Sequence, residues 1–342
     1  MFPVNRVTWL LLGLFLLGAL LKPVAADQSQ AHQIEVSPQY GASAVSLYLV
    51  DETGQYLIPV SRRVPAAEQN DPRRALEALI AGPQAGPELR AVLLPQTRLL
   101  DFEVVAGTAR VNLAAPAFAT DPPRQAIDAL RFTLTEFPSI TAVELALDGQ
   151  PVDAQGNLAA QVTPLPRPAA INSTEEPSGQ AVTMYYGYGP DRSMLAPVTR
   201  YLPVGANLIE QAMQQLLAGP PPGSGLISVI PADVHLLKAG LEQGVAFVDL
   251  SEELVYAYRL KQANALQVRK AVIATLTSLP GVYAGSIEIG GSALLYFSCQ
   301  NVVMERPQAK PWAINDEFYL APLTPHSLRS PSSPTGEGDR RE

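Results

Sequence analysis

Residues 76–83 read LEALIAGP, and residues 213–220 read MQQLLAGP. Both stretches place apolar residues at helical spacing and then break at a Gly-Pro pair, which ends a helix because proline cannot continue the hydrogen-bond ladder. The same motif for the end of a helix therefore occurs twice in one chain of 342 residues. Such self-similarity indicates an internal duplication.

The duplication covers residues 45–150 and 182–291, which follow the same order of motifs with only small insertions. Chance is a poor explanation for an order kept over so many stretches. The matched pairs, in chain order, are 46–50 with 183–186, 58–60 with 196–198, 94–95 with 230–231, 111–113 with 248–250, and 133–138 with 275–280.

Each copy has the pattern of mixed α and β structure. An alternating stretch at 46–50 and a second one ending at Val64 predict a hairpin of strands. Asn70-Asp71-Pro72 predicts a helix start, because aspartate caps a helix and proline suits its first turn. Two more strands, a second helix ending at proline and a last strand complete each copy. We therefore predict an α+β fold of two homologous small domains, each with two helices packed on one face of a small, mostly antiparallel sheet.

The ordered set of motifs resembles the GerMN domain of sporulation and spore germination proteins. Val111-Asn112-Leu113-Ala114 in the first copy departs from the pattern, because Asn and Ala replace an Asp-Ser pair. The resemblance implies a tandem two-domain member, with a domain similar in shape to the ring-building modules of secretion-like complexes. The stretches that carry it are Leu76–Pro83, Leu94–Leu100, Val248–Ser251 and Thr275–Pro280.

The N-terminus predicts export. Thr8–Leu21 is an apolar run of the length of a signal peptide and short for a helix that spans a bilayer. Small residues at Val24-Ala25-Ala26 suit a cleavage site, and no cysteine lies directly after the run, so we expect no lipoprotein anchor. The chain is expected at the extracytoplasmic face of the cell membrane or secreted.

The predicted division has six segments. They are a signal peptide or N-terminal membrane anchor (1–26), a linker (27–44), a first GerMN-like domain (45–163), a proline-rich linker (164–181), a second GerMN-like domain (182–303) and a C-terminal extension with a disordered end (304–342).

Composition excludes several classes of function. The net charge of −8 and the lack of a basic cluster argue against nucleic acid as a partner, since phosphate binding needs a basic face. The single cysteine, Cys299, excludes an intramolecular disulfide and a cysteine-rich metal site. We expect no cofactor and no bound metal.

The sequence contains few residues that are suited to catalysis. His235 is the one histidine inside a predicted domain, and we interpret it as a strand-end residue. The acidic cluster of Asp249, Glu252 and Glu253 has no equivalent at Asn112, so a structural role is favoured over a paired acid and base. The chain is predicted not to be an enzyme.

The residues that we single out for binding are Tyr185, Tyr186 and Tyr188, on the first hairpin of the second copy. Packing in the core or on a sheet face is the default for such residues, and a glycan or peptide contact surface is the alternative.

The leading hypothesis is a non-enzymatic envelope protein that supports sporulation or spore germination through assembly with other proteins at the membrane. Its expected partners are proteins of the envelope or of a sporulation complex. A protein that binds peptidoglycan or another cell-wall polymer is the first alternative. An extracellular accessory of a membrane sensor is the second, because similar domains occur in such lipoproteins.

Overall fold

The computed structural model describes residues 43–84, 88–189, 193–205, 207–261, 263–292, 296–297, 302–303, 307–311 and 313–317. The predicted export segment, Cys299 and the end of the chain lie outside these ranges. No helix within them is both long and apolar enough to cross a bilayer. Both repeats lie in one compact unit, Val36–Glu342.

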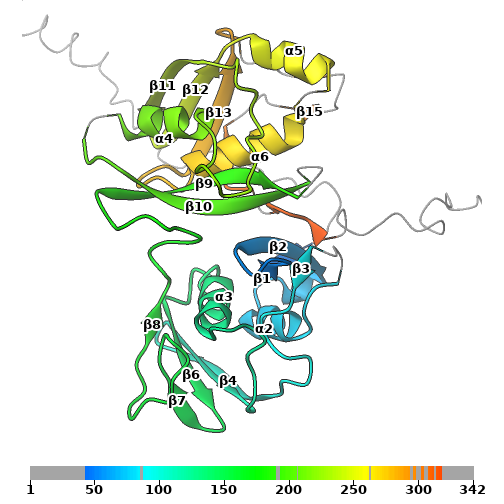
Figure 1. Cartoon of the computed structure of the whole chain (residues 1–342), viewed down its shortest axis with the longest axis vertical. Helices are drawn as coiled ribbons and strands as arrows, with labels where there is room; N and C mark the ends of the chain where they lie inside the picture. Colours follow the sequence, from blue (N-terminus) through cyan, green and yellow to red (C-terminus); the bar gives the residue numbers. More distant parts are fainter. Residues whose placement is uncertain are drawn as a thin grey trace, which may run out of the picture. The chain divides into compact units, whose positions relative to one another are not determined.

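The first repeat begins with a hairpin and continues with helices and short strands (Figure 1). Its elements are β1 (Ser43–Asp51), β2 (Leu57–Val64), a 3-10 turn η1 (Ala66–Glu68), α2 (Pro72–Ile80), β3 (Leu89–Arg90), β4 (Leu99–Val105), β5 (Thr108–Leu113), α3 (Arg124–Leu134), β6 (Ala142–Leu147), β7 (Gln150–Val152) and β8 (Leu165–Pro166).

The second repeat keeps the order of the main elements, with an added helix, α5, and with no counterpart of η1 or β3 among its described residues. Its elements are β9 (Gln180–Tyr188), β10 (Met194–Leu202), α4 (Leu208–Leu217), β11 (Leu236–Glu242), β12 (Val245–Leu250), α5 (Glu253–Arg259), α6 (Ala265–Leu276), β13 (Ala284–Ile289), β14 (Tyr296–Phe297), β15 (Val302–Val303) and β16 (Gln308–Ala309).

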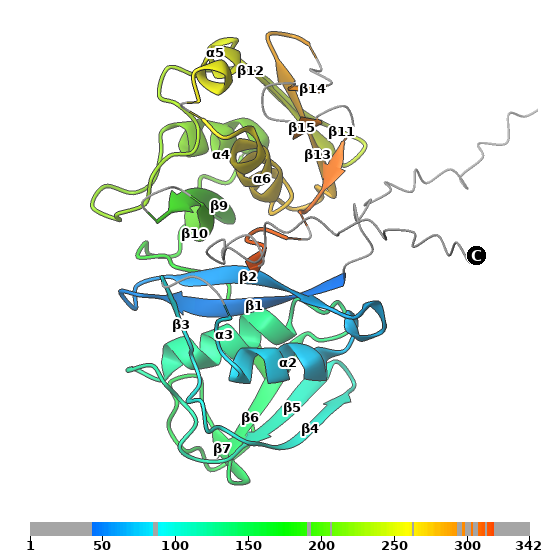
Figure 2. The same ribbon diagram turned by 90° about the vertical axis from the view of Figure 1, so that its right-hand side faces the viewer.

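The strands of each repeat divide into two groups, with the helices between them. In the first repeat, α2 and α3 lie between the β1–β2 hairpin and the sheet of β4 to β7 (Figure 2). In the second, α4 and α6 contact β9 on one side, and β11 and β13 respectively on the other. The fold-class prediction of two α+β domains with small, mostly antiparallel sheets is confirmed. The sequence pattern alone did not show that the helices are covered on both sides.

The central pair of the larger sheet of each repeat is parallel. Strands β5 and β6 pair in parallel across α3, and β12 and β13 pair in parallel across α6. Parallel neighbours need a crossover connection, and the long helix supplies it in each repeat. All other strand pairs described here are antiparallel.

Local sequence signals explain where the helices begin. The side chain of Asp71 accepts a hydrogen bond from the backbone nitrogen of Arg73, and Pro72 occupies the first helical position of α2. This is the cap that the sequence predicted. Asn264 caps α6 in the same way, accepting from the nitrogens of Leu266 and Gln267.

The acidic residue of the Val-Asp-Leu motif closes a turn. Oδ1 of Asp249 accepts a hydrogen bond from the backbone nitrogen of Gly291 at 3.0 Å. In the first repeat, Oδ1 of Asn112 accepts from the nitrogen of Gly149 at 2.9 Å. Aspartate and asparagine both supply this acceptor, which explains why either residue serves at the position.

We therefore expect Asp249→Asn to unfold at nearly the same urea concentration as the wild type, and Asp249→Ala to lose about 1 kcal/mol of unfolding free energy. Circular dichroism during urea titration measures both. A loss in Asp249→Asn as large as that in Asp249→Ala would show that the negative charge, not the acceptor, is what the fold requires.

Candidate functional site

The three predicted binding residues lie on β9, and all three are buried. The hydroxyl of Tyr188 donates to Oδ2 of Asp51 at 3.0 Å, and its ring meets the ring of Tyr56 edge-on. The hydroxyl of Tyr186 donates to the sulfur of Met184. These contacts match the packing interpretation, and contact of the three tyrosines with a glycan or peptide stays a prediction.

Two segments outside the matched motifs form a second duplication. The first, strap 1 (residues 165–175), contains RPAAIN at 167–172, and the second, strap 2 (residues 308–317), contains KPWAIN at 310–315. Each strap begins by pairing with the sheet of its own repeat, through β8 on β6 and β16 on β13. The predicted linker at 164–181 and the start of the predicted extension thus belong to the folded unit.

The asparagine of strap 1 joins the two repeats. Its amide oxygen accepts from the backbone nitrogen of Leu57, and its amide nitrogen donates to the carbonyl of Leu57, both at 2.8 Å. The same Asn172 nitrogen donates to the carbonyl of Pro197 in the second repeat at 2.7 Å. One side chain therefore holds β2 and β10 together.

Strap 2 repeats this arrangement with the repeats exchanged. The amide of Asn315 accepts from the nitrogen of Leu195 at 2.8 Å and donates to its carbonyl at 2.9 Å. It also donates to the carbonyl of Pro59 at 2.7 Å. Leu195 and Pro197 occupy in β10 the positions of Leu57 and Pro59 in β2, so the two clamps are reciprocal.

Ion pairs also join the hairpin of each repeat to the strap of the other repeat. Arg62 of β2 makes a bidentate pair with Glu317 of strap 2, at 2.7 and 2.9 Å, and donates to the carbonyls of Ala78 and Gly82 at the end of α2. Both side chains of the pair are buried. Arg200 of β10 pairs with Glu175 of strap 1.

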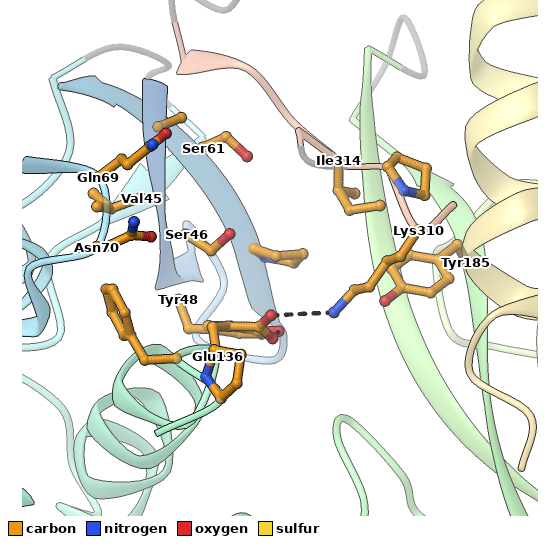
Figure 3. Close-up of a pocket in the computed structure, with 15 residues that line it drawn as sticks. Val45, Ser46, Tyr48, Ser61, Gln69, Asn70, Glu136, Tyr185, Lys310 and Ile314 are labelled. Carbon is orange, nitrogen blue, oxygen red and sulfur yellow. Dashed lines mark hydrogen bonds and ion pairs between the residues drawn. The ribbon is translucent and has the colours of Figure 1, made fainter. Parts of the chain in front are cut away.

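A cavity lies where the straps cross the hairpins. Cavity 1, of about 240 Å³, is enclosed by β1, β2, the end of α3 and strap 2. Figure 3 shows Glu136, Tyr48, Tyr185 and Lys310 around it. Cavity 2, of about 220 Å³, has the equivalent walls in the second repeat: β9, β10, the end of α6 and strap 1. Tyr48, Tyr185 and Lys310 line both cavities.

Glu136 is the charged centre of cavity 1. Its carboxylate accepts from the Tyr48 hydroxyl at 2.8 Å, from Nη2 of Arg167 at 2.6 Å and from Nζ of Lys310 at 3.1 Å. Burial alone would raise the pKa of Glu136, but Lys310 and Arg167, together with the hydrogen bonds, lower it to about 2. The guanidinium of Arg167 also lies over the Phe132 ring at 4.8 Å.

Sequence reasoning did not identify Glu136, Arg167 or Lys310. The available signal was the pair of hexapeptides, RPAAIN and KPWAIN, which directly follow the short strands β8 and β16. Their proline content is typical of a linker and hid the repetition.

His235 and Glu253, which the sequence analysis weighed as catalytic residues, make structural contacts. The backbone nitrogen of His235 donates to the Ser251 hydroxyl at 3.0 Å. Glu253 opens α5, where hydrogen bonds with Ser251 and its own backbone nitrogen lower its pKa. Within the described ranges, no group of three or more His, Cys, Asp or Glu side chains is placed to hold a metal ion.

The fold and the strap junction define a class: an α+β protein built from two copies of one helix-between-sheets unit. The sequence model of the Germane family, described as "Sporulation and spore germination", matches residues 46–153 and 183–295. The chain belongs to this family.

A known protein and a solved structure, both GerM of Bacillus subtilis, resemble the chain over most of their length. The spore germination protein GerM of Bacillus subtilis (strain 168) is 24% identical over 317 residues, which cover 87% of this chain and 86% of that protein. The solved structure of the tandem GerMN domains of the sporulation protein GerM from Bacillus subtilis superposes with a TM-score of 0.61 at 24% identity, covering 80% of this chain and 99% of that one. This likeness shows that the two share the tandem fold.

Removal of either clamp should destabilise the whole unit. We expect Asn315→Ala and Asn172→Ala each to lose about 2–4 kcal/mol of unfolding free energy, because each leaves buried backbone groups without partners. Asn70→Ala, at an exposed asparagine, is the matched control and should change it by less than about 0.5 kcal/mol. Urea unfolding followed by tyrosine fluorescence measures all three, and wild-type stability in Asn315→Ala would contradict the clamp.

The Glu136 cluster should make stability depend on acid pH. The folded pKa of about 2 lies below the ordinary value of 4.5, so the ionised form is favoured by folding and its contribution is full above about pH 4.5. It is lost as the pH falls through about 2. We expect the stability advantage of the wild type over Glu136→Gln to shrink by on the order of 3 kcal/mol between about pH 6 and 2. A constant difference in urea titrations across this range would contradict the assignment.

Proposed function

We propose that the protein is a non-enzymatic, extracytoplasmic envelope protein that supports sporulation or spore germination by assembling with other proteins at the membrane. The observation that carries the proposal is the family match over both repeats, together with similarity to a spore germination protein along most of the chain. The location rests on the apolar run at 8–21, a sequence feature outside the described residues.

The reciprocal straps support a role as a rigid two-repeat body. Each repeat supplies a strap to the other, so the spacing of the two repeats is set by hydrogen bonds and a buried ion pair rather than by a free linker. A rigid body holds its outer surfaces at a constant separation, which suits a component that bridges or aligns partners.

The outer edge strands are the surfaces that we assign to assembly. Strands β4 and β11 stand at the ends of their sheets. Leu100 on β4 is 44% exposed and its equivalent on β11, Leu237, is 57% exposed. Val104 and its equivalent Leu241 are exposed as well. The same apolar pair is thus repeated on an unpaired edge of both repeats, and such an edge accepts an added strand from a partner.

The test is crosslinking of a tagged chain in its native host, with mass spectrometry of the captured proteins. We expect membrane-embedded sporulation or germination proteins with the wild type, and loss of that capture in the double variants Leu100→Lys/Val104→Lys and Leu237→Lys/Leu241→Lys. Lysine at a strand edge opposes further pairing. The control is Leu158→Lys, at an exposed leucine outside the two edge strands.

Both double variants should unfold at the wild-type urea concentration, because the substituted side chains face solvent. Capture of the same partners by wild type and variants would remove the edge strands from the proposal. Recovery of wall fragments alone would favour binding of a cell-wall polymer instead.

A further inference from the structure

Several residues that line the two cavities are equivalent in the two repeats. Tyr48 of the first repeat corresponds to Tyr185 of the second, since each is the strand partner of the proline in its hairpin, Pro59 or Pro197. Arg167 of strap 1 corresponds to Lys310 of strap 2, because each stands five residues before its clamping asparagine. These four side chains meet at the junction.

The acid of cavity 1 has no equivalent in cavity 2. Glu136 stands two residues beyond the end of α3, and the residue at the same distance beyond α6 is Ser278. The hydroxyl of Ser278 is turned to the backbone, where it bonds the nitrogen and carbonyl of Thr183 and the carbonyl of Thr275. Cavity 2 therefore lacks the carboxylate that cavity 1 contains.

The missing acid leaves a hydroxyl without a partner. In cavity 1 the Tyr48 hydroxyl donates to Glu136. Tyr185 is only 6% exposed and lines both cavities, yet its hydroxyl has no hydrogen-bond partner among the described residues. Because Tyr185 lines the cavity, its hydroxyl can donate to a water or a ligand there.

The missing acid also leaves a positive charge in excess. Arg167 and Lys310 share the single carboxylate of Glu136, so the cluster carries one net positive charge. None of the described residues that line cavity 2 is acidic, and Arg167 and Lys310 both line it. The other polar groups of its lining are hydroxyls of tyrosine, serine and threonine. This set of donors is typical of an oxyanion site.

We propose that cavity 2 binds a small oxyanion, a carboxylate or phosphate group, in the position that corresponds to the Glu136 carboxylate of cavity 1. The Tyr185 hydroxyl donates to the anion, and Arg167 and Lys310 supply the compensating charge. The site joins one residue of the second repeat and one from each strap, so a bound anion strengthens the junction. This inference is independent of the proposed assembly function.

The experiment is thermal unfolding of the full chain without its export segment, at constant ionic strength, in sodium phosphate, sodium acetate or sodium chloride. We expect phosphate or acetate to raise the melting temperature relative to chloride. At ten times its Kd, the anion should increase the folding equilibrium constant about elevenfold. N-acetylglycine and its amide form a matched pair that separates the effect of a carboxylate from that of the attached atoms.

Three variants test the placement of the anion. Tyr185→Phe should abolish the difference between the anions, whereas Tyr283→Phe, at an exposed tyrosine, should retain it. Ser278→Glu restores the carboxylate of the first repeat, so it should abolish the difference and melt higher than Ser278→Gln in chloride.

Isothermal titration calorimetry with inorganic phosphate and with acetate gives a readout that does not depend on the stability of a variant. Heat of binding in the wild type and in Tyr283→Phe, and none in Tyr185→Phe, would support the site. Equal stabilisation of wild type and Tyr185→Phe by the anions would mean a general salt effect and would overturn the proposal. Absence of any heat with both anions would overturn it as well.

Discussion

The structure depends on how the outer backbone groups of two hairpins are satisfied. Strand β2 stands at the end of its sheet, and β10 pairs with β9 alone. Their outward nitrogens and carbonyls need partners because buried backbone groups left without hydrogen bonds are costly. The asparagines of the two straps supply these partners, each bonding both backbone groups of one leucine and reaching one proline carbonyl of the opposite repeat. Proline serves well in these strands because it withdraws only the donor and leaves the carbonyl to the clamp.

Charge is added to this junction in two different ways. The Arg62–Glu317 pair is buried, and both of its side chains make further hydrogen bonds to the backbone, so it fixes one geometry more than it adds net stability. The Glu136 cluster is partly exposed and asymmetric, with two cations on one acid. The molecule has two similar halves, and glutamate at 136 against serine at 278 gives only cavity 1 a carboxylate among its lining residues.

Local signals allowed much of the fold to be predicted from the sequence. The hairpins, the cap at Asp71, and the proline-terminated helices all depend on residues that are neighbours in the chain. Helix α5 has no counterpart in the first copy, so the repetition did not predict it. The straps escaped prediction because their order comes from partners more than a hundred residues away, while their own composition is that of a linker.

The candidate site was found only in part for the same reason. Tyr185 drew attention as one of a group of tyrosines on a strand, but periodicity does not tell which tyrosine hydroxyl lacks a partner. Glu136, Arg167 and Lys310 come from a helix end and two straps, and only the tertiary fold brings them together. Knowledge of the second duplication, RPAAIN with KPWAIN, would have paired Arg167 with Lys310 in advance.

The Arg62–Glu317 pair has a consequence for the order in which the chain folds. Arg62 and Glu317 are 255 residues apart. Arg62 therefore cannot form this ion pair until almost the whole described chain has been synthesised. Because synthesis begins at the N-terminus, the contacts between the first repeat and strap 2 form last. Contacts of such long sequence separation slow folding. The folded state is therefore stable only when strap 2 is present. A truncated chain that ends before strap 2 leaves Arg62 next to the carbonyls of Ala78 and Gly82 without the carboxylate of Glu317. Proteases degrade such incompletely folded chains.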